Sequence, residues 1–209
     1  SDLEYFRKLR NSNSYIIGGL LSVEGLHALE NDINNLDFLF DNGYRIMGLV
    51  HFFDNEVGGS SAGISKGGLT DLGKQVIKKM NQRKIIIDLA HASDQVIDEV
   101  LELSTEPVIV SHTGVKGMVA SQRNLSDRHI RAIADKGGLI GIGFWAEAVG
   151  STHPQDIARS ITYVAELVGS EHVALGSDFD GAVETSFDSS EIIYITEALL
   201  REGMPHEDI

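Results

Sequence analysis

Two histidines close two neighbouring apolar runs of the sequence. His91 follows the run at residues 85–90, and His112 follows the run at residues 108–111. Short β-branched runs of this kind are typical of strands buried on both faces of a parallel sheet, and such sheets place their chemistry at the carboxyl ends of the strands. Imidazole is a common zinc ligand, and neighbouring strand ends would bring both rings within reach of one ion. The pattern predicts a metal site, although hydrogen-bonded structural histidines would give the same pattern.

Four further side chains follow strand-like segments or lie in a loop over the same face. Glu24 ends the segment 22–25 and is either an ordinary loop acid or a carboxylate ligand that bridges two ions. Asp178 follows an apolar run and would lie at the mouth of the same sheet. His51 also follows an aliphatic run and, judged alone, is a structural residue. Arg123 is either a solvated loop residue or a planar fork that clamps a substrate carboxylate.

The rest of the sequence supplies the elements that would position these side chains. Strand-like and helix-like segments alternate six times, after a short amphipathic helix at residues 2–11. We expect strands at residues 15–22, 44–52, 85–91, 108–112, 139–145 and 173–177, each leading to a helix, at residues 27–42, 70–83, 93–103, 126–136, 154–168 and 189–201. Alternation at this period predicts βαβ units and one parallel sheet.

Two architectures fit six such units. An open doubly wound sheet would be complete at this length, whereas a closed (β/α)8 barrel needs eight units and about 250 residues. The sequence begins in what resembles the end of a helix, and residues 204–209 resemble the first turn of another. We therefore predict an α/β fold of the TIM-type (β/α)8 barrel class, incomplete in this chain, with units three to eight present and the first two strand–helix units missing. Residues 1–209 would form a single catalytic-type barrel domain that is truncated at both ends.

The composition narrows the classes of partner. The formal net charge of -14 argues against a nucleic-acid partner, which would need clustered Lys and Arg. Because the chain has no cysteine, any metal must be held by His, Asp or Glu. No apolar run approaches the roughly 18 residues of a membrane span. Since the N-terminus also lacks the features of a signal peptide, we expect no membrane span and a cytoplasmic location.

Several segments together resemble the renal (membrane) dipeptidase family, whose members are metal-dependent dipeptidases with an amidohydrolase-like barrel. The resemblance covers essentially the whole chain in the same order, and the segments that carry it are residues 23–25, 87–91, 110–112, 121–124 and 176–181. The loop segments 52–56 and 65–69 resemble the bacterial branch of the family. Each segment alone is a weak signal, and their combination is quite specific.

The resemblance implies a site for two zinc ions, or for other divalent metals. Glu24 would match the carboxylate that bridges the ions, and His91 and His112 would match the ligands of one of them. The family also carries a His-x-Asp pair at the end of its first strand, which supplies further ligands of the second ion. No His-x-Asp precedes Glu24 in this sequence. This departure agrees with the two missing units and puts the second metal, and with it catalysis by this chain alone, in doubt.

The resemblance also implies how a dipeptide substrate would be bound and cleaved by a metal-activated water. His51 would polarise the scissile carbonyl group and stabilise its oxyanion. Arg123 would hold the C-terminal carboxylate of the dipeptide. Asp178 would contact the attacking water and the amino group of the substrate. Contacts to both termini would select dipeptides, and the protein would be a metallo-dipeptidase, as a monomer or a homo-oligomer.

Two alternatives stay open at this point. The first is a catalytically incomplete barrel fragment that needs an N-terminal partner segment. The second is a serine hydrolase using Ser61, because residues 59–63 fit the pattern G-x-S-x-G. That motif requires a sharp turn from a strand to a helix, whereas Ser61 lies deep in a long predicted loop. The serine hydrolase is therefore the weaker alternative.

Overall fold

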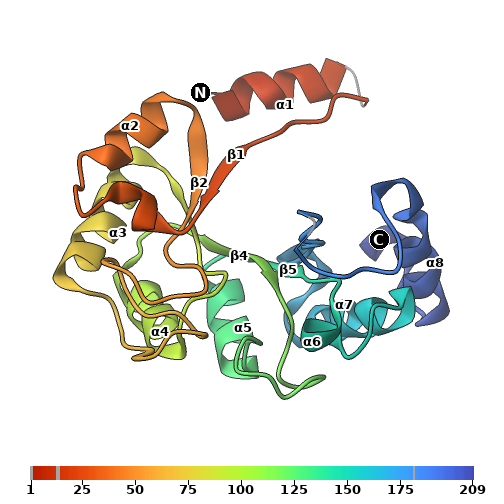
Figure 1. Ribbon diagram of the computed structural model, residues 1–209. Coiled ribbons are helices and arrows are strands. Elements are labelled where there is room, and N and C mark those ends of the chain that lie inside the picture. Colours follow the sequence, from red (N-terminus) through yellow and green to blue (C-terminus); the bar gives the residue numbers. More distant parts are fainter. Residues whose placement is uncertain (1, 13–14, 181) are drawn as a thin grey trace.

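A six-stranded parallel sheet surrounded by helices forms the body of the protein (Figure 1). The computed structural model describes residues 2–12, 15–180 and 182–209. The strands are β1 (Leu21–Glu24), β2 (Tyr44–Gly48), β3 (Ile86–Asp88), β4 (Val108–Thr113), β5 (Leu139–Ile142) and β6 (Val173–Leu175). The α-helices are α1 (Asp2–Ser12), α2 (Asn35–Asp41), α3 (Asp71–Arg83), α4 (Asp94–Leu103), α5 (Asp127–Asp135), α6 (Ala146–Val149), α7 (Pro154–Val168) and α8 (Ile193–Arg201). Single 3-10 turns occur at η1 (Leu26–Leu29), η2 (Ser170–His172), η3 (Ser189–Glu191) and η4 (His206–Asp208).

The order of the strands decides between the two predicted architectures. Neighbours in the sheet are also neighbours in the sequence, from β1 to β6, and every pair is parallel. A doubly wound sheet would reverse its strand order at a switch point, and this sheet does not. In Figure 1 the helices lie outside a curved sheet, as they do around a barrel. The prediction of an incomplete TIM-type barrel is confirmed, and the open doubly wound sheet is excluded.

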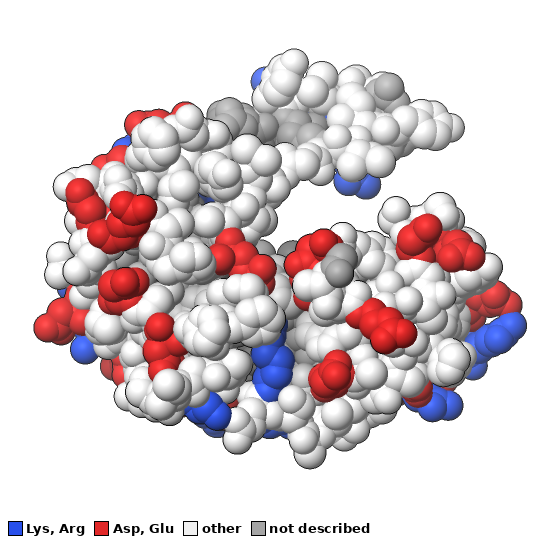
Figure 2. Space-filling model, in the orientation of Figure 1, with Lys and Arg blue, Asp and Glu red and all other residues white. Residues whose placement is uncertain are grey.

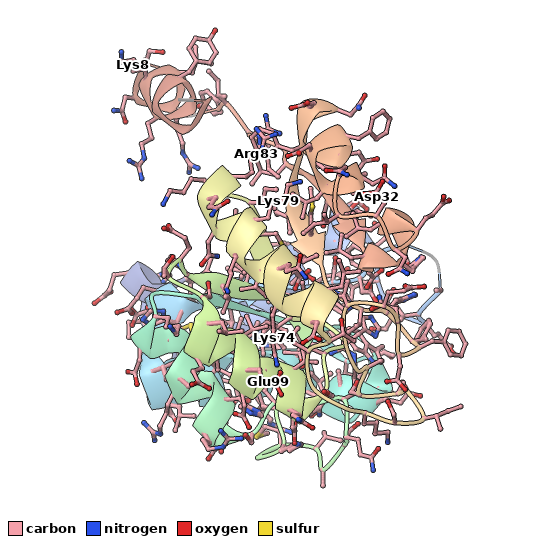
Figure 3. All side chains as sticks on the ribbon, turned by 90° about the vertical axis from the view of Figure 1, so that its left-hand side faces the viewer. Lys8, Asp32, Lys74, Lys79, Arg83 and Glu99 are labelled. Atoms are coloured by element: carbon pink, nitrogen blue, oxygen red, sulfur yellow. The ribbon has the colours of Figure 1, made fainter. Side chains whose placement is uncertain are left out.

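β1 and β6 form the two edges of this arc within the described part of the chain. Both edges carry exposed apolar side chains, since Leu21 is 56% exposed and Leu175 is 51% exposed. The inner strands are buried instead, and the apolar faces of α3, α4, α5 and α7 pack against them to form one continuous core. Outside the core, Lys79 and Arg83 of α3, labelled in Figure 3, both pair with Asp37 of α2.

Three helices begin where their capping residues predict. The side-chain oxygens of Thr70, Ser93 and Ser126 accept hydrogen bonds from backbone N–H groups in the first turns of α3, α4 and α5. A cap of this type stabilises a helix by about 1 kcal/mol. The caps matter for the site because they fix where each loop after a strand ends.

Other predicted boundaries are wrong. The strand expected at residues 15–22 begins only at Leu21 and continues to Glu24. The helix expected at residues 27–42 is divided into η1 and α2, because Glu30 and Asn31 adopt left-handed conformations with φ of 48° and 64°. The strands expected at 44–52 and 139–145 end at Gly48 and Ile142, and the short helix α6 was not predicted. Among the described residues, no helix is both long and apolar enough to cross a bilayer.

Candidate metal centre

Three side chains from three strand ends meet at one point. Glu24 Oε1 lies 3.0 Å from His91 Nε2 and 3.2 Å from His112 Nε2. The two histidine Nε2 atoms are 3.0 Å apart. Ligands about 2.0–2.1 Å from a tetrahedral zinc ion are separated by about 3.3 Å, so this triangle fits a divalent cation of that size. Glu24, His91 and His112, each predicted separately, are thus brought together.

The register of the sheet explains this meeting. Glu24 pairs with Gly48 of β2, and Gly48 pairs with Asp88 of β3, so the ends of these strands are level. His91 follows Asp88 in a tight turn and has a left-handed φ of 64°, with its carbonyl oxygen accepting a hydrogen bond from Ser61 N (2.8 Å). The strained backbone turns the ring of His91 back over the end of the sheet.

Asp88 is a residue of the site that the sequence prediction left without a role. Its side chain is buried, and its Oδ1 atom accepts hydrogen bonds from Ala90 N (3.0 Å) and Ser111 N (2.9 Å). One carboxylate oxygen therefore joins the turn that leads to His91 with the strand residue that precedes His112. An acid at the end of a buried strand was the available signal, but the backbone groups that it binds are not visible in a sequence.

The protonation states suit metal binding at neutral pH. Hydrogen bonds to His112 and His91 hold the pKa of Glu24 well below its usual range. Burial lowers the pKa of His91 to about 4, with the hydrogen bond to Glu24 opposing this shift. Glu24 is therefore anionic and His91 neutral, which are the forms that coordinate cations. Ser111 Oγ lies 2.9 Å from His112 Nδ1, a second contact of the kind that orients metal-binding imidazoles.

His51 lies beside this cluster, beyond the end of β2. Its Nε2 atom is 3.8 Å from Glu24 Oε2, and its ring centre is 4.6 Å from that of His91. The half-exposed ring of Phe52 covers both imidazoles, at 4.1 Å from His51 and 5.2 Å from His91. The backbone carbonyl of His51 accepts a hydrogen bond from the buried Ser60 Oγ. His51 is thus held at the rim of the cluster with its Nε2 atom facing Glu24.

The loop from residue 53 to residue 68 supports both His51 and His91. Asp54 organises this loop, since its carboxylate accepts hydrogen bonds from Ser60 N and Ser65 N, each at 2.8 Å. These bonds lower the pKa of Asp54. Ser60 Oγ then binds the carbonyl of His51, and the N–H of the next residue binds the carbonyl of His91. The long loop is therefore an ordered brace for two histidines.

Arg123 and Asp178 complete the group of predicted residues. Arg123 Nη2 donates a hydrogen bond to His112 O (2.9 Å), and burial lowers the pKa of the guanidinium to about 10 while Asp88, Glu24 and Asp178 oppose that shift. Burial is likewise the main cause of the raised pKa of Asp178, and its neighbours His112 and Arg123 act in the opposite direction. Arg123 thus contacts the backbone of His112, and the carboxylate of Asp178 interacts electrostatically with His112, Glu24 and Arg123.

The residues around Asp178 form a turn. Asp178 has a left-handed φ of 60°, Asp180 N donates to Asp178 O (2.8 Å), and Asp180 Oδ1 accepts from Ala182 N (2.7 Å). Asp180 is therefore a turn residue. Gly181, which belongs to the same sequence motif, lies outside the described residues.

The serine hydrolase alternative finds no support in this geometry. Ser61 Oγ is buried without a hydrogen-bond partner among the described atoms, and the hydrogen bond from Ser61 to His91 is made by its backbone N–H. A nucleophilic serine needs a base within hydrogen-bonding distance of its hydroxyl group. Ser61 instead serves the loop that braces the histidines.

Comparison with known proteins agrees with the fold and the cluster. The family model described as "Membrane dipeptidase (Peptidase family M19)" matches residues 6–209. "Dipeptidase verJ" of Clonostachys rogersoniana is 32% identical over 200 residues, which are 92% of this chain and 52% of that protein. A Rhodobacter sphaeroides metallo peptidase, solved with a phosphinate mimic of L-Ala-D-Ala, is 26% identical with a TM-score of 0.84, over 97% of this chain and 62% of its own.

A further structure supports the fold alone. The probable dipeptidase PvdM of Pseudomonas aeruginosa superposes with a TM-score of 0.86 at 23% identity, over 98% of this chain and 68% of that chain. The chain thus spans about half of the Clonostachys protein and less than two thirds of the Rhodobacter protein. Because the family model covers all but the first five residues, the chain belongs to the membrane dipeptidase family.

Proposed function

We propose that residues 1–209 provide the catalytic barrel domain of a metal-dependent dipeptidase. The observation that carries the proposal is the triangle of Glu24, His91 and His112 at the strand ends of a chain in this family. Zinc suits a set of two imidazoles and one carboxylate, and when bound it would supply a water of near-neutral pKa and polarise a carbonyl group. We expect Glu24 to bridge to a second ion, whose His-x-Asp ligands do not precede Glu24 in this sequence.

The remaining residues would bind and orient the substrate. His51, at the rim of the cluster, would donate a hydrogen bond to the scissile carbonyl oxygen and stabilise its developing charge. Arg123 would pair with the terminal carboxylate, because a buried guanidinium gains most from an anionic partner that arrives with the ligand. Asp178, with its raised pKa, would hold the attacking water and the amino group of the substrate. The distance between these groups would restrict the substrate to two residues.

Zinc binding and hydrolysis test this function together. The purified chain should bind zinc and cleave Ala-Ala, and Glu24→Gln should abolish both without unfolding the protein. Supplying an N-terminal segment with a His-x-Asp strand, in cis or in trans, tests the alternative that the chain is an incomplete barrel. A gain of activity on addition would support that alternative. If neither form binds zinc or cleaves a dipeptide, the proposed function is wrong. The predicted cytoplasmic location and a homo-oligomeric state stay predictions.

A further inference from the structure

A large cavity lies between the loop that follows β2 and the loop that follows β4. Its volume is about 570 Å³, and its lining includes Ser61, Lys66, Lys116 and Gln122. Pockets for small molecules have volumes of about 300–1,000 Å³, so the cavity has room for more than one side chain. None of the roles described above uses it.

Residues on two walls of the cavity are hydrogen-bonded to residues of the proposed substrate site. Ser61 contributes to its wall and donates its N–H to the carbonyl of His91 (2.8 Å). Ser121 and Gln122 form the opposite wall and directly precede Arg123, with Ser121 Oγ accepting from Arg123 N (3.3 Å). A ligand whose terminal carboxylate reached Arg123 would have its last side chain next to this cavity.

The cavity is basic on a chain that is strongly acidic. The sequence has 31 acidic and 17 basic residues, and carboxylates are spread over the face shown in Figure 2. The cavity nevertheless has two lysines against one carboxylate, Asp94. Lys116 is paired with Asp94 (3.1 Å), whereas Lys66 Nζ contacts the neutral amide oxygen of Gln122. Lys66 therefore provides the excess positive charge of the cavity.

The backbone of Lys66 is fixed from both sides. Ser65 is held by two hydrogen bonds to Asp54 Oδ2, from its N–H (2.8 Å) and its hydroxyl (3.0 Å). Gly67 O accepts a hydrogen bond from the buried Ser93 Oγ (2.7 Å). Lys66 itself has a left-handed φ of 50°. A cation on an anchored backbone loses less entropy when it binds an anion than one on a mobile loop.

We infer that this cavity is a specificity site for an acidic side chain, with Lys66 as its cationic contact. The inference rests on the proposed function, and it names the preferred substrates as dipeptides whose C-terminal residue is Glu or Asp. Arg123 would bind the terminal carboxylate and Lys66 the side-chain carboxylate of the same residue. Two anion sites would thus lie next to each other, one at Arg123 for the terminal carboxylate and one at Lys66, beside Gln122, for the side-chain carboxylate.

Binding of non-hydrolysable analogues tests the inference without relying on turnover. Phosphinate analogues of Ala-Glu and Ala-Gln differ by one charge and are similar in size. Isothermal titration calorimetry on the zinc-supplemented chain should show about fivefold tighter binding of the Ala-Glu analogue, the effect expected of one partly exposed ion pair. Lys66→Met should remove this preference, and Lys66→Arg should retain it.

Lys8→Met is the matched control, because it removes the same charge from α1. This helix lies away from α4 (Figures 1 and 3), and Asp94 and Gln95 of α4 line the cavity. It should leave the preference unchanged. Equal affinity for the two analogues, no binding of either one, or a preference that survives Lys66→Met would each overturn the inference. The proposed function fails separately, if the zinc-supplemented chain shows the preference but cleaves neither Ala-Ala nor Ala-Glu, even when the N-terminal segment with a His-x-Asp strand is supplied.

Discussion

The Nε2 atoms of His91 and His112 lie 3.0 Å apart, although one residue follows β3 and the other lies near the end of β4. Two unprotonated imidazole nitrogens repel one another at this distance, so the pair requires a proton or a cation between them. Burial disfavours a proton on His91, and Glu24 faces both nitrogens with a carboxylate oxygen, so the group is suited to a cation. This relationship makes the cluster directly testable.

Replacing His112 by alanine should lower the affinity for zinc by at least about 100-fold, because even residues that only orient a ligand contribute about 10–100-fold. Competition with a chromogenic chelator measures the change. His153→Ala is the control, since His153 is exposed and only precedes α7. Equal losses in the two variants would contradict the assignment of His112.

Asp88 should contribute through its hydrogen bonds rather than its charge. In Asp88→Ala two buried N–H groups, those of Ala90 and Ser111, lose their acceptor, at a cost of about 1–3 kcal/mol each. Asp88→Asn keeps one oxygen acceptor and should lose much less stability and retain most of the zinc affinity. Urea unfolding and chelator competition report the two effects. Equal losses of stability and zinc affinity in the two variants would show that the charge of Asp88, rather than its hydrogen bonds, is required.

The metal-free chain should lose stability as the pH falls from about 6.5 to about 4. Burial lowers the pKa of His91 from 6.5 to about 4, so the unfolded chain binds a proton in this window that the folded chain excludes. The free energy of unfolding therefore rises with pH across the window, by at most about 3 kcal/mol. Below pH 4.5 the unfolded chain also binds a proton at Glu24. The folded chain does not, because the pKa of Glu24 is lowered there, so the loss of stability becomes larger.

Urea unfolding at several pH values in the presence of a chelator measures this dependence. His91→Gln removes the titrating group and keeps a polar side chain of similar reach, so its stability should vary less between about pH 4.5 and about pH 6.5. An unchanged slope in this variant would assign the pH dependence to other groups.

The carboxylate of Asp54 packs so closely against Gly63 that a side chain at position 63 has no room. A Cβ atom on Gly63 would lie 1.9 Å from Asp54 Oδ1, so Gly63→Ala should displace Asp54 and cost about 1–3 kcal/mol. Hydrogen exchange should rise over residues 54–68, and zinc affinity should fall because the contact to the His91 carbonyl loosens. Gly19→Ala, where a Cβ meets nothing within 4 Å, should change neither quantity. Normal exchange in Gly63→Ala would show that the loop does not depend on Asp54.

Local patterns in the sequence predicted local structure well. Thr70, Ser93 and Ser126 begin helices because their side-chain oxygens bind N–H groups only three residues away. The prediction of one helix at residues 27–42 failed for a local reason as well. Glu30 is left-handed although its residue type does not favour this conformation, and Asn31, whose type does favour it, is also tolerated in helices. Helix boundaries that depend on backbone conformation rather than on residue type were therefore not predicted.

The site was only partly predictable for a different reason. Glu24, His91 and His112 could be found because ligand-type side chains at strand ends are visible in the sequence. Asp88 could not, because its partners are backbone N–H groups, one in the turn after β3 and one in β4. The contact of Lys66 with Gln122 joins residues 56 positions apart, which no pattern along the chain connects. The side chains of the site were visible, but the interactions that hold them in place were not.

The sequential order of the strands has a consequence for how the protein is made. Glu24 leaves the ribosome with β1, but its partners emerge later, His91 after β3 and His112 within β4. Until then the nascent chain holds an acidic residue at the end of a partly formed sheet, without the imidazoles that lower its pKa. Domains generally fold as units during synthesis, beginning from the N-terminus. We therefore expect the capacity to capture a metal to arise late and in one step, when β4 joins the sheet.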